Sequence, residues 1–311
     1  MKRGIYLVAN LRSQAICKNL IYSVRSSGCT LPIRLIHFGG KEIQSPYILD
    51  QVELMRFEDF PIDAQNFITN LRSVLTDCPL GFLYRYLAWF SDWDEFIYSD
   101  NDIVALCNWS DMFNYLEGYD MVHADEEYTT KGIFNYNEPS LVDEIFGEFA
   151  LESAITAGHI VVKRNNKMIE DINNAIEWFK KNPHIPKKHD QALMHIASLL
   201  GKWKLLNLCK SHNWLSSWAG DYKNSLQLIQ LIQNKNTKIS HLHYSGGTPQ
   251  GNLAIQDFLF SKDGDQDRLL KLSLLGLRSL SGFNSFSHHY FRVKRYCTRR
   301  LTKALFSFSH F

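Results

Sequence analysis

The N-terminal part of the chain alternates short apolar runs with one amphipathic segment. Residues 4–10, GIYLVAN, indicate a buried strand that ends in a polar loop. Residues 13–29 place their apolar positions three and four apart, with Gly28 just past the end, which predicts a helix. Residues 31–40 and 51–57 predict a second and a third strand. This β–α–β–(α)–β order is typical of an α/β protein with a mostly parallel sheet and crossover helices.

The later segments continue this alternation. Residues 95–106, EFIYSDNDIVAL, predict a central strand whose first half is apolar and aromatic. Residues 129–150 show no clear period, and we expect a loop over the sheet edge. The other expected elements are helices at 81–93, 110–118, 167–182 and 188–203, and strands at 119–128, 154–165, 204–208 and 239–246.

The central strand carries two carboxylates, one residue apart, directly after its apolar run. Asp100, Asn101 and Asp102 precede Ile103, where the apolar pattern resumes. Ligands of open parallel sheets bind at the carboxyl ends of strands, and two carboxylates in a turn there can hold one Mg²⁺ or Mn²⁺ ion. The alternative is that Asp100 or Asp102 caps the helix that follows.

A histidine and a glycine pair stand close together in residues 241–250, HLHYSGGTPQ. The imidazole of His243 is a suitable ligand for Mn²⁺ beside carboxylates. Gly246 and Gly247 would let backbone N–H groups approach a phosphate closely. The alternative is a hairpin turn with a surface histidine.

An acid and an amide open the helix expected at 188–203. Asp190 and Gln191 could bind sugar hydroxyls if the start of this helix faces a cleft. The alternative is that Asp190 only stabilises the helix dipole.

The charge distribution distinguishes the end of the chain from the rest. The 311 residues are 45% hydrophobic and 21% charged, which is ordinary for a globular protein of one large domain with an appendage. The net charge is +2, but the stretch from Arg268 onward has nine Lys or Arg and no acid, which leaves −7 on the preceding residues. This basic and aromatic tail favours an anionic membrane surface as partner. Nucleic acid is disfavoured because no nucleic-acid-binding module is present, and an ordinary packed helix is the other alternative.

The six cysteines are scattered and form no CxxC pair, which favours reduced thiols, a cytosolic compartment and no cysteine-based metal site. The apolar run at the N-terminus is too short for a signal peptide. No stretch reaches the roughly 18 apolar residues of a membrane-spanning helix. We therefore expect a cytoplasmic protein that is soluble or peripheral on the inner face of the cytoplasmic membrane.

Taken in chain order, these motifs resemble those of the GT-A nucleotide-sugar glycosyltransferases. They are LYRYLAWF, the D-x-D, ITAGHIVV, the H-D-Q segment and the H-Y-S-G-G-T-P segment. The resemblance is closest to the family eight retaining enzymes, which include bacterial lipopolysaccharide galactosyltransferases, and it covers roughly residues 1–255. It implies a Rossmann-like, mostly parallel central sheet flanked by helices. We expect this catalytic domain over 1–265 and a helical basic and aromatic appendage over 266–311.

The resemblance implies a divalent cation beside the donor. Asp100, Asp102 and His243 match the family's ligands for Mn²⁺ or Mg²⁺. Arg85 matches an arginine that helps to hold the nucleotide sugar, and Asn101, between the two acids, is a further donor contact.

Gln191 and Asp190 are the implied catalytic residues, because the family's D-Q pair lies beneath the anomeric carbon of the donor sugar. Gln191 is a poor nucleophile, so we expect it to stabilise the cationic sugar. Asp125 matches a region that faces the acceptor, and a solvated loop is the alternative there. In a retaining enzyme the departing phosphate can take the acceptor's proton, whereas Glu152 is a candidate base if the enzyme inverts.

Ala9, Asn10 and Arg12 follow the first strand, where the family binds the nucleotide base and ribose. The chain departs from the family in five ways. The usual Asp before this loop is absent, and Thr156 stands where Asn is usual. The late loop is one residue shorter, with Thr248 where Lys is usual and Gln250 where Trp is usual. Neutralising the phosphates would then depend on Arg85, Arg12 or a nearby Lys.

The implied function is metal-dependent transfer of a hexose from a nucleotide diphosphate sugar, with UDP favoured, to a glycan or lipid-linked acceptor. Retention and a place in bacterial polysaccharide or lipopolysaccharide synthesis are part of the same expectation. A GDP-sugar-using, mannosyltransferase-like enzyme and an inactive glycosyltransferase-like scaffold stay open as alternatives. Sugar nucleotidyltransferases are disfavoured because they need a glycine-rich loop after the first strand, and VANLRSQ has no glycine.

Overall fold

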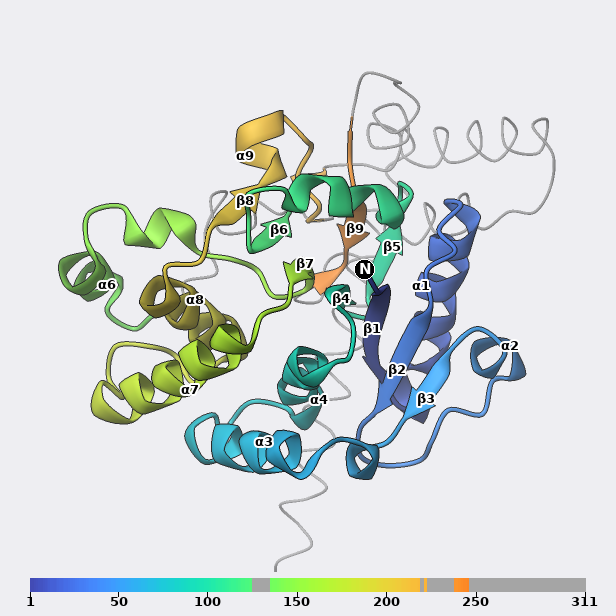
Figure 1. Ribbon diagram of the computed structural model, residues 1–311, viewed down its shortest axis with the longest axis horizontal. Helices are drawn as coiled ribbons and strands as arrows, with labels where there is room; N and C mark the ends of the chain where they lie inside the picture. Colours follow the sequence, from blue (N-terminus) through green and yellow to red (C-terminus); the bar gives the residue numbers. More distant parts are fainter. Residues whose placement is uncertain (125–134, 219–220, 223–237, 246–311) are drawn as a thin grey trace, which may run out of the picture. The chain divides into compact units, whose positions relative to one another are not determined.

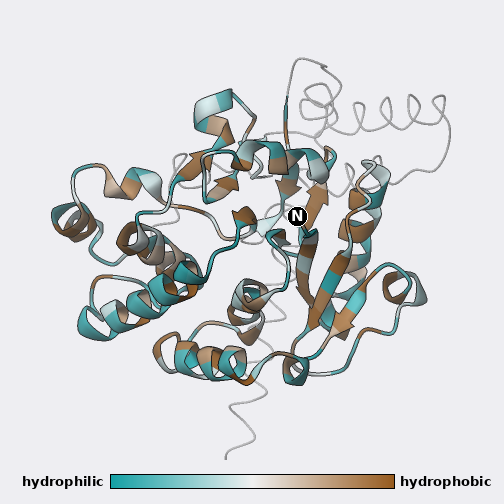
Figure 2. Ribbon diagram, viewed as in Figure 1, coloured by the Kyte–Doolittle hydropathy of each residue, from teal (hydrophilic) through white to brown (hydrophobic). Residues whose placement is uncertain are grey.

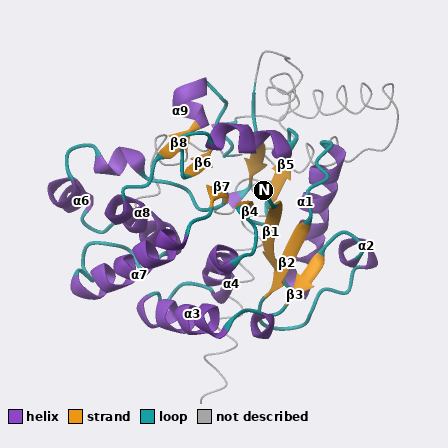
Figure 3. Cartoon of the chain, in the orientation of Figure 1, coloured by secondary structure: helices purple, strands orange, loops and turns teal. Residues whose placement is uncertain are grey.

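The structure is a computed structural model that describes residues 1–124, 135–218, 221–222 and 238–245. One compact unit consists of Met1–Trp218 and Lys238–Tyr244 (Figures 1 and 3). Its strands are β1 (Arg3–Ala9), β2 (Ile33–His37), β3 (Glu53–Met55), β4 (Glu95–Ser99), β5 (Ile103–Ala105), β6 (Met121–His123), β7 (His159–Lys163), β8 (Leu205–Asn207) and β9 (His241–His243). Its α-helices are α1 (Gln14–Ser26), α2 (Pro46–Leu49), α3 (Ile62–Val74), α4 (Leu80–Tyr84), α6 (Pro139–Phe146), α7 (Asn166–Lys181), α8 (Asp190–Gly201) and α9 (Leu208–His212). Its 3₁₀ helices are η1 (Leu11–Ser13), η2 (Phe57–Asp59), η3 (Arg85–Phe90), η4 (Trp109–Leu116) and η5 (Ala150–Ser153).

The central sheet has the strand order β3-β2-β1-β4-β7-β6-β8. The four strands from β3 to β4 are parallel, and β6 is parallel to β8. Only β7 runs antiparallel to both of its neighbours. Helices flank the sheet, with α1 and α2 apart from the group of α3, α4, α7 and α8 (Figure 1). The expected GT-A-like fold, a mostly parallel central sheet flanked by helices, is confirmed.

Both faces of the sheet are buried, which explains the continuous apolar runs in the sequence. In β1, Tyr6 and Val8 belong to one hydrophobic cluster, together with residues of α3, α7 and α8. Ile5, Leu7 and Ala9 belong to a second cluster, together with residues of α1 and η4. In Figure 2 hydrophobic residues gather on the central strands, while α3 and α7 carry hydrophilic residues as well.

The predicted strand at 95–106 is two strands of different sheets. Residues 95–99 form β4 of the central sheet, whereas 103–105 form β5, which pairs antiparallel with β9. In place of the helix expected at 81–93, α4 ends at Tyr84 and is followed directly by the 3₁₀ helix η3, which ends at Phe90.

The expected loop at 129–150 is wrong in its described part. Pro139 begins α6, in the first helical position where its missing N–H costs nothing, and Ala150 begins η5. The 266–311 appendage and the boundary after residue 265 lie outside the described residues. Among the helices that are described, none has both the length and the apolar character needed to cross a membrane.

Candidate active site and metal centre

The D-x-D segment forms a turn between β4 and β5, beyond the carboxyl end of β4. The N–H of Asp100 donates to the carbonyl of Gly158 at 2.7 Å, which ties the turn to the start of β7. The side-chain amide of Asn101 donates to the carbonyl of Val8 at 2.5 Å and lies 3.5 Å from the hydroxyl of Ser13. The turn is therefore fixed to two neighbouring strands through groups other than its carboxylates.

The alternative that Asp100 or Asp102 caps the next helix is wrong. That helix is η4, and its N-cap is Asn108, whose side chain accepts the N–H of Ser110 at 3.0 Å. The presence of two carboxylates after β4 therefore needs another explanation, which the neighbouring side chains provide.

Asp100, Asp102 and His243 meet in one cluster, although His243 lies far from the two acids in the sequence. One ligand atom from each residue lies within 4.8 Å of the others. The pairing of β5 with β9 brings them together, because Ile103 is opposite His243 in the register. Nε2 of His243 lies 3.4 Å from Oδ1 of Asp102.

The donor set of this cluster fits a hard divalent cation. Two carboxylates and one imidazole are ligands that Mn²⁺ and Mg²⁺ accept. Two atoms bound to one Mg²⁺ ion can be separated by at most twice the metal–ligand distance, roughly 4.2 Å. The three ligand atoms lie within 4.8 Å of one another, so small side-chain adjustments would bring them to one ion.

The two acids differ in their electrostatic surroundings. Burial raises the pKa of Asp100, and the charge of Arg85 opposes this only in part. Burial acts in the same direction on Asp102, but the hydrogen bond and charge of His243 outweigh it and lower the pKa of that carboxyl. This effect comes from a protonated His243, and a bound cation would take the place of that charge, with His243 as a neutral ligand.

Arg85 is almost fully buried and joins two of the predicted site residues. Its side chain is 2% exposed. Nη2 lies 3.1 Å from Oδ1 of Asp100, and Nε lies 3.0 Å from Oδ2 of Asp190. Nη1 donates to the carbonyl of Ala157 at 2.7 Å, and Nε donates to that of Phe82 at 3.1 Å. The structure therefore shows Arg85 as a buried link between carboxylates, and direct contact with a donor stays a prediction.

Asp190 and Gln191 lie at the N-terminus of α8, as the sequence predicts. Asp190 is fully buried, with Nδ1 of His189 2.8 Å from its Oδ1. Burial acts to raise the pKa of Asp190, but the charge of Arg85 and the contact with His189 outweigh it and lower that pKa. Gln191 is 9% exposed, and its Oε1 accepts from Nδ2 of Asn135 at 3.4 Å. Asp190 is also in the first turn of the helix, so the dipole alternative and the site hypothesis are compatible.

The loop after β1 adjoins the D-x-D turn through the contact of Asn101 with Ser13. Asn10 caps η1 and donates its side-chain amide to the carbonyl of Phe38 at 3.2 Å. Ala9 is buried, so only its backbone could serve a ligand, whereas Arg12 is exposed. Three predicted residues lie outside the described part of the chain, namely Asp125, Gly246 and Gly247.

Two tyrosines of the site were not predicted. The hydroxyl of Tyr98 donates to Oδ1 of Asp100 at 2.7 Å. The hydroxyl of Tyr86 donates to the backbone carbonyl of Asp190 at 2.7 Å. The only signal in the sequence was position, because Tyr98 stands two residues before an acid and so lies on the same side of an extended chain.

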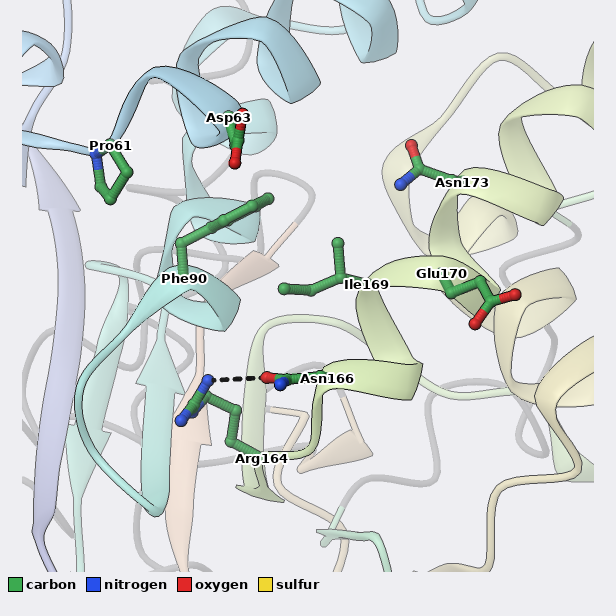
Figure 4. A pocket seen from close by; sticks show the side chains of 8 residues that line it. All are labelled: Pro61, Asp63, Phe90, Arg164, Asn166, Ile169, Glu170 and Asn173. Carbon is green, nitrogen blue, oxygen red and sulfur yellow. Dashed lines mark hydrogen bonds between the residues drawn. The ribbon is translucent and has the colours of Figure 1, made fainter.

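An open cavity of about 570 Å³ lies away from this cluster. Figure 4 shows Phe90 and Ile169 in the middle of the cavity lining, with Asp63 and Asn173 above them and the hydrogen-bonded Arg164 and Asn166 below. The N–H of Arg164 donates to the carbonyl of Asp94, so this cavity adjoins the amino end of β4, whereas the D-x-D follows the carboxyl end. None of the predicted site residues lines it. Its lining residues are Pro61, Asp63, Phe90, Arg164, Asn166, Ile169, Glu170 and Asn173.

The sheet is mostly parallel, and a D-x-D turn and a histidine lie together beyond the carboxyl end of its strand β4, as the resemblance to GT-A-like glycosyltransferases implies. A family model described as "Mannosyltransferase putative" matches residues 2–243. The chain belongs to that family and is a glycosyltransferase.

Solved glycosyltransferase structures are similar to the chain at low sequence identity. The bifunctional glycosyltransferase WbbM has 11% identity and a TM-score of 0.47, over 79% of this chain and 46% of that one, so the chain spans less than half of WbbM. The galactosyltransferase LgtC, solved with donor and acceptor sugar analogues, has 13% identity and a TM-score of 0.47, over 88% and 96%. Mouse xyloside xylosyltransferase 1 has 12% identity and a TM-score of 0.48, over 80% and 99%. No curated protein matches the chain.

Proposed function

We propose that the protein transfers a hexosyl group from a nucleotide diphosphate sugar to a hydroxyl group of a glycan or lipid-linked acceptor, with Mn²⁺ or Mg²⁺ bound by Asp100, Asp102 and His243. The observation that carries the proposal is the meeting of these three side chains within 4.8 Å. When bound, such a cation neutralises the charge of the departing nucleotide diphosphate. Bacterial polysaccharide or lipopolysaccharide synthesis is the proposed setting.

The protein's own residues have distinct proposed roles around the donor. Asn10 and Arg12 would contact the nucleoside, as would the backbone at Ala9. Gln191 would stabilise the cationic sugar, since its amide is polar, uncharged and a poor nucleophile. Asp190 is fully buried and paired with Arg85, which favours a positioning role over nucleophilic attack.

The donor-side roles of Asn101, Gly246 and Gly247 and the acceptor-side role of Asp125 belong to the same proposal. We also propose retention of the anomeric configuration. Glu152, the candidate base for inversion, is exposed in η5, and its backbone carbonyl accepts a hydrogen bond from Nζ of Lys210 at 2.8 Å. The α-or-β configuration of the product, read from the anomeric proton coupling by NMR, decides between retention and inversion.

UDP-sugars and GDP-mannose are both candidate donors, and different observations favour each. The resemblance of the motifs to family eight favours a UDP-sugar. The family description names mannosyl transfer, which favours a GDP-mannose donor as the second candidate. The two predict different nucleotide preferences, so nucleotide binding separates them before the acceptor is known.

The first experiment is calorimetric binding of UDP and GDP, each with and without Mn²⁺. We would compare wild type with Asp102→Asn, which keeps the shape of the side chain and removes its charge. Asp63→Asn is the matched control, because Asp63 is an exposed aspartate lining the distant cavity. We expect Mn²⁺-dependent binding of one nucleotide to wild type and Asp63→Asn, and its loss in Asp102→Asn.

Three other outcomes would argue against the proposal in different ways. Binding of neither nucleotide to wild type would contradict an active donor site and favour the inactive scaffold. Binding without Mn²⁺, unaffected by Asp102→Asn, would contradict the metal assignment. Nucleotide binding without hydrolysis or transfer of any tested UDP- or GDP-sugar would also favour the scaffold.

We further propose that the basic stretch from Arg268 onward associates with an anionic membrane surface on the cytoplasmic side. Support comes from its nine Lys or Arg without any acid, on a chain whose preceding residues carry −7. Sedimentation with vesicles of phosphatidylcholine and phosphatidylglycerol tests this. Full-length protein should sediment in low salt, and a variant lacking residues 285–311 should stay in solution. Equal sedimentation of both would refute the proposal.

A further inference from the structure

Gly158 contacts two of the three residues of the proposed metal cluster, Asp100 and His243. Its carbonyl accepts the N–H of Asp100 at 2.7 Å. A Cβ on Gly158 would lie 2.4 Å from Cε1 and 2.9 Å from Nδ1 of His243, closer than side-chain carbons approach ring atoms. The imidazole of His243 therefore lies directly against the Cα of Gly158, in space that any side chain would occupy.

The next residue, His159, contacts the ring of His241, which lies in β9 together with His243. Its ring is 1% exposed and lies between two others, with centroids 4.3 Å from Trp109 and 4.3 Å from His241. His241 and His243 are two residues apart in β9, so their side chains are on the same side of that strand. Gly158, directly before β7, and His159, its first residue, thus contact two residues on the same side of β9.

The nitrogen atoms of His159 do not explain its position. Within the described residues neither Nδ1 nor Nε2 of this ring has a hydrogen-bond partner, and burying such groups is unfavourable. Its shape accounts for the position, because a flat ring fills the space between Trp109 and His241.

We infer that Gly158 and His159 are positioning residues for His243. Gly158 leaves room for the imidazole of His243 and fixes Asp100 through its carbonyl. His159 packs against His241 and so fixes the position of β9, which carries His243. This inference rests on the proposed function, in which His243 is a metal ligand. Neither residue need touch the ion or the substrate for its replacement to weaken cation binding.

Gly158→Ala is the direct test, with Gly4→Ala as matched control. A Cβ on Gly4 would lie 2.2 Å from the ring of Trp93, so the control crowds a buried aromatic ring at the start of β1, far from the cluster. Mn²⁺ affinity is measured by electron paramagnetic resonance of the full-length protein, at a temperature where thermal melting shows each variant to be folded. We expect Gly158→Ala to weaken Mn²⁺ binding roughly 10- to 100-fold. Gly4→Ala should melt earlier but bind Mn²⁺ like wild type.

Two substitutions of His159 distinguish a packing role of its ring from a role of its nitrogen atoms. His159→Phe keeps a ring between Trp109 and His241, and we expect Mn²⁺ affinity within about threefold of wild type. His159→Ala removes the ring, and we expect a loss of roughly tenfold or more. Equal, large losses in both variants would overturn the packing role.

A second measurement keeps the inference independent of the metal assignment. In metal-free protein labelled with ¹⁵N-histidine, the ring signals of His243 should shift in Gly158→Ala and stay in place in Gly4→Ala. If wild type binds no Mn²⁺, the proposed metal site fails, and these signals still decide whether Gly158 positions His243. Unchanged His243 signals and unchanged Mn²⁺ affinity in Gly158→Ala would overturn the inference while leaving the proposed function intact.

Discussion

Arg85→Met should destabilise the protein strongly, because it removes the cation between two acids. Arg85 is 2% exposed and lies 3.1 Å from Asp100 and 3.0 Å from Asp190. Methionine can fill much of the space but leaves both carboxylates in the interior without their partner. Removing one member of a buried ion pair costs about 3–5 kcal/mol, since the remaining charge stays buried. We expect the free energy of unfolding at pH 7 to fall by about that amount.

The matched control is Arg56→Met. Arg56 also makes a close ion pair, with Nε 2.6 Å from Oε1 of Glu42, but these side chains are 52% and 44% exposed. An exposed pair contributes about 0–1 kcal/mol, because water solvates both charges after the pair is broken. Urea unfolding of both variants, followed by circular dichroism, gives the two losses. Their difference reports the effect of burial.

A double-mutant cycle with Asp190→Asn shows whether the loss arises at the proposed contact. Removing the charge of Asp190 should make Arg85→Met less costly, with a coupling energy of roughly 0.5–3 kcal/mol. The reasoning is refuted if Arg85→Met loses no more than Arg56→Met with an unchanged m value. It is also refuted if the coupling with Asp190 is zero.

Three further predictions concern single side chains. Arg85 and His189 keep the pKa of Asp190 low despite burial, so its carboxylate stabilises the fold above its unfolded pKa of about 3.9 and loses this effect as pH falls through the lower folded pKa. The urea midpoint of Asp190→Asn should therefore fall less from pH 5 to pH 3 than that of wild type, and an equal or larger fall would contradict this. Tyr98→Phe removes the 2.7 Å hydrogen bond to Asp100 and should cost about 1.5–3 kcal/mol in urea unfolding, whereas unchanged stability would count against that bond. Burial raises the pKa of Cys17 from 9.0 to about 12, so its thiolate should be about a thousandfold rarer in the folded protein. Iodoacetamide should therefore label Cys17 far more slowly in folded than in unfolded protein. Equal labelling rates, measured by mass spectrometry, would contradict its burial.

The D-x-D could be found from the sequence because it interrupts an apolar run abruptly. This signal lies within a few consecutive residues and needs no knowledge of the fold. His243 was found because the resemblance supplies the pairing of a late histidine with early acids. The separation of β4 from β5 could not be found, since both segments are short and apolar and the choice of partner strand is tertiary. The burial of Arg85 was equally hidden, because an arginine on an aromatic-rich helix fits an exposed face until Asp190 is known to lie 3.0 Å away.

The antiparallel direction of β7 explains why residues 157–158 lie next to the D-x-D turn. Parallel strands deliver their last residues to the carboxyl edge of β4. An antiparallel strand instead brings the residues before its first position to that edge, and the register places His159 opposite Ser99. The segment before β7 therefore reaches the D-x-D turn with carbonyls that the central ladder does not use. Ala157 accepts from Arg85, and Gly158 accepts from the turn itself while leaving space for a ring. The segment before the reversed strand thus supplies two backbone acceptors at this site and the room for the imidazole of His243.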